Sequence, residues 1–513
     1  MKRIATGIAG LDTVLNGGLE QGAVVVVAGG PGTGKTILAQ QMCFALATAE
    51  HKAVYYTTVS EPHAKLISHL EPFTFFEPEA LGPRVEHIHL GDFLRPPRPE
   101  GLQPMVSEIV RKALDEEPAL VVIDSAKMLR DFTDERELRS ALHDLTGLFA
   151  QSGTLLLLLG EYGPEELGNS TEFSLADGII QLDYQVREPV DRRTLRIAKM
   201  RGGRHVPGRH TFQIGSGGLQ IYPRIETLVP ASVTPVPGPI RTGIPGLDQL
   251  MTGGMKQGDA TLVMGPSGVG KTTLGMRWIT QGLEDGESGL FVTFQDTADN
   301  LVSMAATFGW DIAAARDSGQ LGISHVPMGE LDLDVLADAI RANLAQRPLR
   351  RIVIDSLAEL VLAAREWDRF PAYMRSLVGF VRAAGSSLLA TSETMVGATA
   401  AQSLEGLMFL FDNVIDVRYI EQHTGLGRAL NVVKMRNGPH QMTLNELTIT
   451  SHGLEVGDSL EGVTGRLGWG ALRTWEPLNL PGPVIPAPAT PARMPAQRGA
   501  ASARRGGGGK RQP

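Results

Sequence analysis

Two glycine-rich segments of the sequence have the spacing of a phosphate-binding loop. GGPGTGKT runs from Gly29 to Thr36 and GPSGVGKT from Gly265 to Thr272, and both fit the pattern G-x-x-x-x-G-K-[ST]. Glycines let the backbone curl so that successive N–H groups point at phosphate oxygens, and a following helix offers its positive dipole end. A single match could arise by accident, but two matches in equivalent contexts predict two sites for a nucleoside triphosphate.

Each residue of these loops has an expected task. Lys35 and Lys271 are expected to reach the β and γ phosphates of ATP, and Thr36 and Thr272 to supply a hydroxyl to Mg²⁺. The residues expected to contact ATP are Gly30, Gly32, Thr33, Gly34, Lys35 and Thr36 in the first loop, and Gly265, Ser267, Gly268, Val269, Gly270, Lys271, Thr272 and Thr273 in the second.

An acidic residue at the end of an apolar strand is the second requirement, because it holds a metal-bound water beside the loop. Asp124 in LVVIDS and Asp355 in RIVIDS fit this position. An aspartate that ends a strand can also cap the following turn. Its recurrence at the same point of both halves favours the metal site, so the predicted Mg²⁺ ligands are Thr36, Asp124, Thr272 and Asp355.

Phosphoryl transfer also needs a group that orients or deprotonates the attacking oxygen. In RecA-type ATPases this group lies just past the second strand, where the sequence has YYTTVSEP in one half and LFVTFQDT in the other. Glu61 is the candidate base of the first half, and Gln295 and Asp296 occupy the region in the second. Ordinary exposed residues at strand ends are the competing interpretation. With the loop lysines, the predicted catalytic residues are Glu61, Lys35, Lys271 and Asp296.

A basic block recurs late in each half. Arg193, Lys199, Arg201 and His205 have the spacing R-x5-K-M-R-x3-H, and Arg428, Lys434, Arg436 and His440 repeat it. Apolar alternation predicts strands that carry these side chains on one face. A solvated basic face is the usual meaning of such a strand. Two matched sets in an acidic chain instead suggest contact with phosphate, also from a neighbouring subunit as arginine fingers do.

The elements that must position these residues follow from an internal repeat. TGIAGLDTVLNGGLEQG from Thr6 returns as TGIPGLDQLMTGGMKQG from Thr242, a shift of 242 − 6 = 236, and the loop lysines keep it, 271 − 35 = 236. Each glycine loop lies between an apolar run and a helical pattern, and further apolar runs alternate with amphipathic segments. The expected fold is α/β, with two tandem RecA-like P-loop NTPase domains built on mostly parallel central sheets.

Composition sets the expected domain bounds. A chain of 513 residues with 42% apolar and 20% charged residues has room for two cores. We expect a first domain at 1–228, a proline-punctuated linker at 229–240, a second domain at 241–476 and a disordered tail at 477–513. The tail is rich in Pro, Ala, Gly and Arg. It is either a solvated extension or a tether for an acidic partner or for nucleic acid.

Charge and hydropathy argue against several classes of protein. The net charge of −8 argues against a chain that coats nucleic acid. The start, MKRIATGIAGLD, lacks a signal-peptide core, and no run reaches the ~18 apolar residues of a membrane span. We therefore expect a cytoplasmic protein without a membrane partner. The single cysteine, Cys43, is expected to be buried filler.

Over roughly its first 470 residues the chain resembles the KaiC family of double-domain RecA-like ATPases. The GLD…GG…G lead-ins, the paired IDS strands and the KMR blocks carry the resemblance. It implies a homo-hexameric ring that holds ATP at subunit interfaces, with Lys199, Arg201, Lys434 and Arg436 touching the nucleotide of a neighbour. Arg193, Arg428, His205 and His440 would be weaker members of the same shell.

The chain departs from the family pattern at two places. Fully active members carry two adjacent glutamates after the second strand, and here Ser60-Glu61 and Gln295-Asp296 stand there. A glutamine can orient water but cannot take a proton. The family's clock members also phosphorylate a Ser-Thr pair in the second lobe. The matching positions fall near Leu407 and Met408, so that cycle is not expected.

The expectation is a slow, oligomeric, Mg²⁺-dependent ATPase of the KaiC type with a signalling or regulatory role and an unknown regulatory partner. Three alternatives remain open. One is a Ser/Thr autokinase with Asp296 as base, and another is a DNA-dependent ATPase of the RecA or RadA kind. The third is a non-catalytic scaffold whose assembly is gated by ATP.

Overall fold

The computed structural model describes residues 2–58, 63–93, 101–163, 166, 170–186, 191–229, 238–364, 367–393, 404–422 and 425–460. Met1–Thr464 forms one compact unit. Most of the predicted linker and all of the predicted tail lie outside the described residues, and so do Ser60 and Glu61. None of the described helices is long and apolar enough to cross a membrane.

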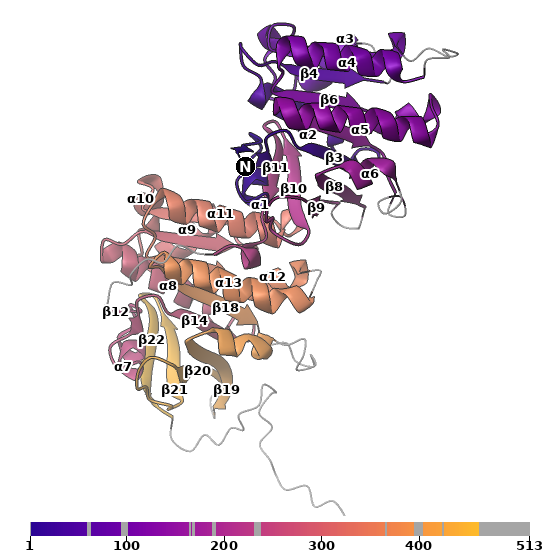
Figure 1. Cartoon of the computed structure of the whole chain (residues 1–513). Coiled ribbons are helices and arrows are strands. Elements are labelled where there is room, and N and C mark those ends of the chain that lie inside the picture. Colours follow the sequence, from indigo (N-terminus) through magenta and orange to yellow (C-terminus); the bar gives the residue numbers. More distant parts are fainter. Residues whose placement is uncertain are drawn as a thin grey trace, which may run out of the picture. The chain divides into compact units, whose positions relative to one another are not determined.

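The first lobe is an α/β unit around a nine-stranded sheet in the order β11-β10-β9-β8-β3-β7-β6-β4-β5 (Figure 1). In this order, the six neighbouring strands β8, β3, β7, β6, β4 and β5 pair in parallel. Strands β9, β10 and β11 extend the sheet in antiparallel fashion. The sheet strands are β3 (Val24–Gly29), β4 (Ala53–Thr57), β5 (Val85–His89), β6 (Leu120–Asp124), β7 (Leu155–Gly160), β8 (Gly178–Gln185), β9 (Arg192–Met200), β10 (His210–Gly215) and β11 (Gly218–Tyr222).

Helices cover both faces of this sheet, because the central strand β3 is apolar on both sides. Val25 and Val27 pack in one cluster with Met42 of the helix after the glycine loop, whereas Val24 and Val26 pack in a second cluster. The helices are α1 (Leu11–Val14), α2 (Lys35–Leu46), α3 (His63–Leu70), α4 (Gln103–Glu116), α5 (Glu135–Ser152) and α6 (Thr171–Leu175), and a small ribbon pairs β1 (Arg3–Ile4) with β2 (Leu19–Glu20). Cys43 on α2 is fully buried, as predicted.

The second lobe repeats this design with the strand order β16-β15-β17-β18-β14-β19-β20-β21-β22. Its sheet strands are β14 (Ala260–Gly265), β15 (Gly289–Thr293), β16 (Leu321–His325), β17 (Arg351–Asp355), β18 (Ser387–Glu393), β19 (Asn413–Gln422), β20 (Gly425–Met435), β21 (Asn445–Thr450) and β22 (Gly453–Ser459). In the sheet order, the neighbouring strands β16, β15, β17, β18, β14 and β19 pair in parallel, and the remaining pairs are antiparallel. The predicted tandem α/β architecture with mostly parallel sheets is thus confirmed.

Helices also alternate with the strands of the second lobe. They are α7 (Pro245–Leu250), α8 (Lys271–Glu284), α9 (Ala298–Thr307), α10 (Ile312–Asp317), α11 (Leu333–Gln346), α12 (Leu357–Ala363) and α13 (Phe370–Ala383), with a ribbon of β12 (Pro239–Ile240) and β13 (Met255–Lys256). Several short 3₁₀ turns connect these elements, among them Ile225–Thr227 at the end of the first lobe and Leu404–Leu410 before β19.

Candidate functional site

The glycine loops connect a central strand to a helix in both lobes, as the sequence predicted. Gly34 and Gly270 immediately precede helices α2 and α8, with φ of 96° and 111°. This left-handed conformation is open to glycine at little cost. The turn brings each helix N-terminus, with its unpaired N–H groups, to the end of the strand where an anion can bind.

The loop lysines fold back over their own loops. Nζ of Lys35 donates hydrogen bonds to the carbonyl oxygens of Gly29 at 3.1 Å and Gly30 at 2.8 Å, and Lys271 repeats this with Gly265 and Pro266 at 3.0 and 2.8 Å. Burial lowers the pKa of both lysines from the ordinary value. An ammonium that donates its hydrogen bonds to neutral carbonyl groups can exchange them for the stronger bonds to charged phosphate oxygens.

A glutamate that the sequence interpretation missed stands next to each lysine. Glu161 follows β7 and lies 3.8 Å from Nζ of Lys35, and Glu393 ends β18 and lies 3.9 Å from Nζ of Lys271. The strand register explains this, because β18 pairs Glu393 with Gly265, the first loop residue. Both carboxylates oppose the lowering of the lysine pKa by burial. The signal was present, since both apolar runs, TLLLLLGE and SLLATSE, end in glutamate.

The predicted metal ligands come together as pairs. Oγ1 of Thr36 donates to Oδ2 of Asp124 at 3.0 Å, and Oγ1 of Thr272 donates to Oδ2 of Asp355 at 2.7 Å. Hydroxyl and carboxylate oxygens at this separation suit Mg²⁺, which keeps waters and phosphate oxygens as its other ligands. The described residues contain no group of three or more His, Cys, Asp or Glu side chains that could hold a metal.

The two aspartates differ in their further contacts. The hydroxyl of Tyr55 on β4 donates to Asp124, whereas the hydroxyl of Thr391 on β18 donates to Asp355. Burial raises the pKa of Asp355, and the hydrogen bonds from Thr391 and Thr272 work against that shift. The peptide bond that follows each aspartate is cis. The same donor and acceptor pair is therefore built with different neighbours in the two lobes.

A cavity of about 990 Å³ opens at the first loop. This volume lies at the upper end of the range of ~300–1,000 Å³ that is common for ligand sites. The described residues that line it include Gly32, Gly34, Lys35, Thr36, Tyr55, Thr57, Asp124, Ser125, Lys127, Arg130, Asp131, Glu161 and Arg193. The predicted loop, the predicted aspartate and the unpredicted Glu161 thus share one space.

Three other residues of the two loops have buried side chains. Thr33 is buried and donates to the carbonyl of Gly30 at 2.9 Å, and Val269 packs in the core of its lobe. Thr273 is also buried, while Ser267 is exposed. These residues can meet a phosphate only through their backbone N–H groups, apart from Ser267, whose hydroxyl is free to reach it.

Arg193 and Lys199 lie on β9, and Arg428 and Lys434 on β20, as the alternation predicted, whereas the second arginine and the histidine of each block follow the strand. Nζ of Lys199 donates to the carbonyls of Phe173 and Ser174 at 2.9 and 3.3 Å, and Nζ of Lys434 to those of Met408 and Phe411 at 3.0 and 2.6 Å. Burial lowers the pKa of both lysines. Neither ammonium touches the loop of its own lobe.

The arginines of the blocks divide into two kinds. Arg201 and Arg436 are exposed, and Arg201 is 3.8 Å from Asp177. Arg193 and Arg428 instead lie over the rings of Tyr184 and Tyr419, at 4.5 and 5.8 Å. The histidines His205 and His440 are both half-buried. Of the described residues around the first cavity, Arg193 is the one that comes from the basic block.

Of the two candidate bases, only Asp296 lies among the described residues. Glu61 lies outside the described residues. Asp296 is half-buried just after β15, where its backbone N–H donates to Oγ1 of Thr293 at 3.1 Å. Gln295 is exposed, and its amide donates to Glu359, a buried carboxylate on α12 that the sequence interpretation did not single out.

A glycine loop between strand and helix, a buried lysine and a Thr–Asp pair beside it define a RecA-like P-loop ATPase domain, and the chain holds two of them. The model of the KaiC ATPase family matches residues 4–226 and 240–461. The chain therefore belongs to the KaiC ATPase family.

Proteins named "circadian clock oscillator protein KaiC" are similar along most of the chain. The protein of Thermostichus vulcanus is 25% identical over 480 residues, which cover 91% of each chain. That of Parathermosynechococcus lividus is 26% identical over 475 residues, 89% of this chain and 86% of the relative. That of Prochlorococcus marinus (strain MIT 9313) is 24% identical over 474 residues, 90% of this chain and 93% of the relative.

Proposed function

We propose that the chain is a Mg²⁺-dependent ATPase that binds ATP at both lobes and assembles into a homo-oligomeric ring, a hexamer, with a signalling or regulatory role in the cytoplasm. The observation that carries this proposal is the Thr–Asp pair beside a buried loop lysine, which occurs in both lobes. The proposed domains are 1–228 and 241–476.

The residues of each loop would divide the work as follows. Backbone N–H groups of the loop would bind the phosphates, and Lys35 or Lys271 would leave its carbonyl partners to reach the β and γ phosphates. Thr36 with Asp124, and Thr272 with Asp355, would hold Mg²⁺. When bound, the metal neutralises charge on the β and γ phosphates. Glu161 and Glu393 hold each lysine in place before the nucleotide arrives.

The first lobe would carry most of the turnover, because Glu61 can accept a proton and Gln295 cannot. Ring assembly would place Lys199, Arg201, Lys434 and Arg436 next to a neighbour's nucleotide. Their side chains do not touch the loop of their own lobe, and Arg201 and Arg436 are exposed and open to a second subunit. His205 and Arg428 would support them.

The test is turnover by the full chain with one loop lysine removed. We expect Lys35→Ala to lower the steady-state rate of ATP hydrolysis to a small residual and Lys271→Ala to leave most of it, while native mass measurement with ATP shows the ring. The reverse pattern refutes the assignment of the lobes. Assembly with ATP but no hydrolysis in the unmodified chain would favour an ATP-gated scaffold.

A timekeeping phosphorylation cycle is not part of this proposal. Leu407 is buried in the short turn before β19, and the carbonyl of Met408 accepts a hydrogen bond from Lys434. These positions therefore offer no hydroxyl for a phosphate. Incubation with γ-labelled ATP followed by mass mapping tests for autokinase activity elsewhere, and stimulation by DNA tests the recombinase alternative.

A further inference from the structure

The second site contains a buried carboxylate at a position where the first lobe has a methionine. Glu359 lies on α12 and is 6% exposed. The strand-end aspartates are offset by 355 − 124 = 231, so the residue that corresponds to Glu359 is at 359 − 231 = 128, which is Met128. Burying a carboxylate is costly unless hydrogen bonds satisfy it, so its partners are informative.

Both oxygens of Glu359 have a partner. Oε2 accepts a hydrogen bond from the hydroxyl of Ser356, and Oε1 accepts one from the side-chain amide of Gln295. Gln295 follows β15 and Ser356 follows β17. These two strands are parallel neighbours, with Thr293 opposite Asp355. The carboxyl ends of the two strands therefore bring Gln295 and Glu359 together across 64 residues of sequence.

Glu359 also acts on the charged groups of the site. Its charge raises the pKa of Asp355, in addition to burial, and raises the pKa of Lys271 against the lowering by burial. The carboxylate is thus within electrostatic reach of both the loop lysine and the predicted metal ligand. Gln295 itself is exposed, so one end of its amide is anchored and the other faces solvent.

We propose that Glu359 is a positioning residue for ATP hydrolysis in the second lobe, where it holds the amide of Gln295 so that the carbonyl oxygen accepts a hydrogen bond from the attacking water. A carboxylate accepts hydrogen bonds only, so it selects the NH₂ side of the amide and leaves the carbonyl oxygen outward. This inference rests on the proposed ATPase function. It gives the second lobe a slower turnover of its own.

The reaction itself needs no proton acceptor on Gln295. The water oxygen bonds to the γ phosphorus, the bond from phosphorus to the bridging oxygen of ADP breaks, and the proton of the water passes to the released phosphate. A glutamine that only orients water has this role in other phosphoryl-transfer sites.

A structural role for Glu359 accounts for one of its two contacts. Ser356 precedes α12 and accepts a hydrogen bond from the N–H of Ala358, and Glu359 follows three residues later, which is the S-x-x-E arrangement of a capping box. Glutamate and glutamine serve equally at that position. Capping gives no reason for the contact with Gln295, so Glu359→Gln separates the two roles.

The experiment uses the full chain with Lys35→Ala, which leaves hydrolysis to the second lobe. Three variants are added to this background: Glu359→Gln, Gln295→Ala and the two together. The control is Glu446→Gln, a matched change at an exposed glutamate on β21. We expect each of the first two to lower kcat at least about tenfold, as misplacement of a reacting group does. The double variant should fall no further, KM for ATP should stay within about twofold, and Glu446→Gln should behave as the parent.

The outcomes separate this inference from the proposed function. No hydrolysis by the unmodified chain refutes the ATPase proposal itself. Hydrolysis by the unmodified chain but none by Lys35→Ala refutes only the inference, and so does an unchanged kcat in Glu359→Gln or in Gln295→Ala. Additive losses in the double variant also overturn it, because the two residues would then act separately. Gln295 is exposed, so its replacement keeps the test valid even if Glu359→Gln unfolds.

Discussion

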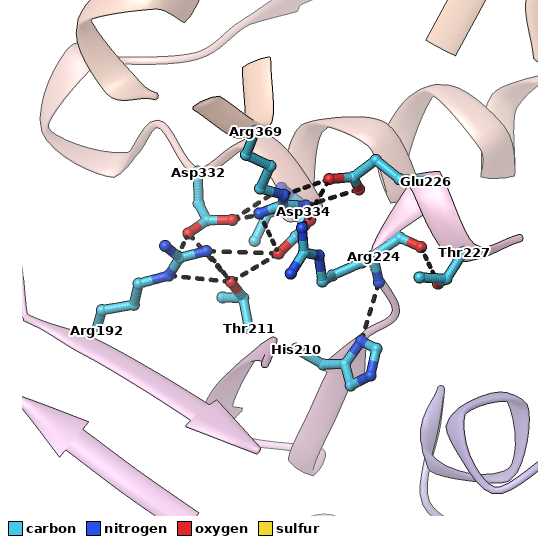
Figure 2. A network of polar contacts seen from close by, with 10 residues as sticks. Arg192, His210, Thr211, Arg224, Glu226, Thr227, Asp332, Asp334 and Arg369 are labelled. Carbon is cyan, nitrogen blue, oxygen red and sulfur yellow. Dashed lines mark hydrogen bonds and ion pairs between the residues drawn. The ribbon is translucent and has the colours of Figure 1, made fainter. Parts of the chain in front are cut away.

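Nη2 of Arg369 in the second lobe donates a hydrogen bond to Oε2 of Glu226 in the first lobe at 2.9 Å (Figure 2). Both side chains are buried, at 8% and 10% exposure, and Arg369 also pairs with Asp334. Burial alone would raise the pKa of Glu226, but the hydrogen bonds from Arg369 hold it below the ordinary value. One guanidinium therefore satisfies two buried carboxylates from different lobes.

Removal of Arg369 should be strongly destabilising. Arg369→Ala leaves Glu226 and Asp334 buried without their main partner, and breaking such a pair costs about 3–5 kcal/mol. Arg192 remains 3.4 Å from Asp334 and offsets part of that loss. Denaturant unfolding measures the change. The control is Arg316→Ala, whose partner Asp299 is 91% exposed, where we expect less than about 1 kcal/mol; equal effects would contradict the prediction.

His210 should make the stability depend on pH. The ring is fully buried, Nδ1 accepts a hydrogen bond from the N–H of Arg224 at 3.1 Å, and Nε2 lies 3.2 Å from the carbonyl of Val206. Burial lowers the pKa of His210 from 6.5 to about 4. The unfolded chain therefore binds the proton first, so the stabilisation is complete above pH 6.5 and is lost as the pH falls toward 4.

The full loss amounts to about 3 kcal/mol at 1.36 kcal/mol per pKa unit. Most of it appears as the difference in unfolding free energy between pH 7 and pH 4.5. His210→Asn should flatten this slope, whereas His452→Asn, at an exposed position, should not. A slope that stays the same in both variants would show that other groups cause the pH dependence.

Asp124→Asn should weaken the use of Mg²⁺ by the first lobe. Asparagine retains an acceptor for Thr36 but loses the charge that attracts the cation. In a chain with Lys271→Ala, we expect the Mg²⁺ concentration for half-maximal hydrolysis to rise about 10–100-fold. Asp115→Asn, 61% exposed on α4, should leave the titration unchanged. If both titrations coincide, Asp124 does not hold the metal.

Glu61→Gln should remove the base proposed for the first lobe. General base catalysis contributes about 10²–10⁴-fold, so hydrolysis should fall to the residual rate of Lys35→Ala while ATP binding persists. Equilibrium binding and turnover measure the two effects separately. Glu71→Gln, at a nearby exposed glutamate, is the control, and retention of full turnover by Glu61→Gln would remove this residue from the mechanism.

A mixture of Lys35→Ala and Arg201→Ala chains should regain first-lobe activity that neither variant has alone. Arg201 is 59% exposed, and if it acts on a neighbour's ATP, random mixing creates intact interfaces in about one quarter of cases (½ × ½). Mixing Lys35→Ala with Glu61→Gln should restore nothing, because both residues belong to one subunit's site. Steady-state hydrolysis after reassembly distinguishes the two mixtures.

Local patterns of the sequence were enough to predict the fold and the placement of the loop residues and Thr–Asp pairs. The glycine loops, their lysines and the Thr–Asp pairs depend on one strand, one turn and one helix, so the apolar runs and the spacing predict them directly. The same holds for the duplication and the mostly parallel sheets. Glu161 and Glu393 were within reach of this reasoning, because Glu161 directly follows, and Glu393 ends, the strand that lies beside the loop strand.

Only the tertiary structure decided the contacts between side chains that are far apart in the chain. Gln295 meets Glu359 across 64 residues, and Arg369 meets Glu226 across 143. Sheet register brings the first pair together and the packing of the lobes brings the second, and no periodicity in the sequence records either. The sequence by itself thus determined two P-loop domains, whereas the contacts of the buried carboxylates Glu359 and Glu226 with their partners depend on the folded chain.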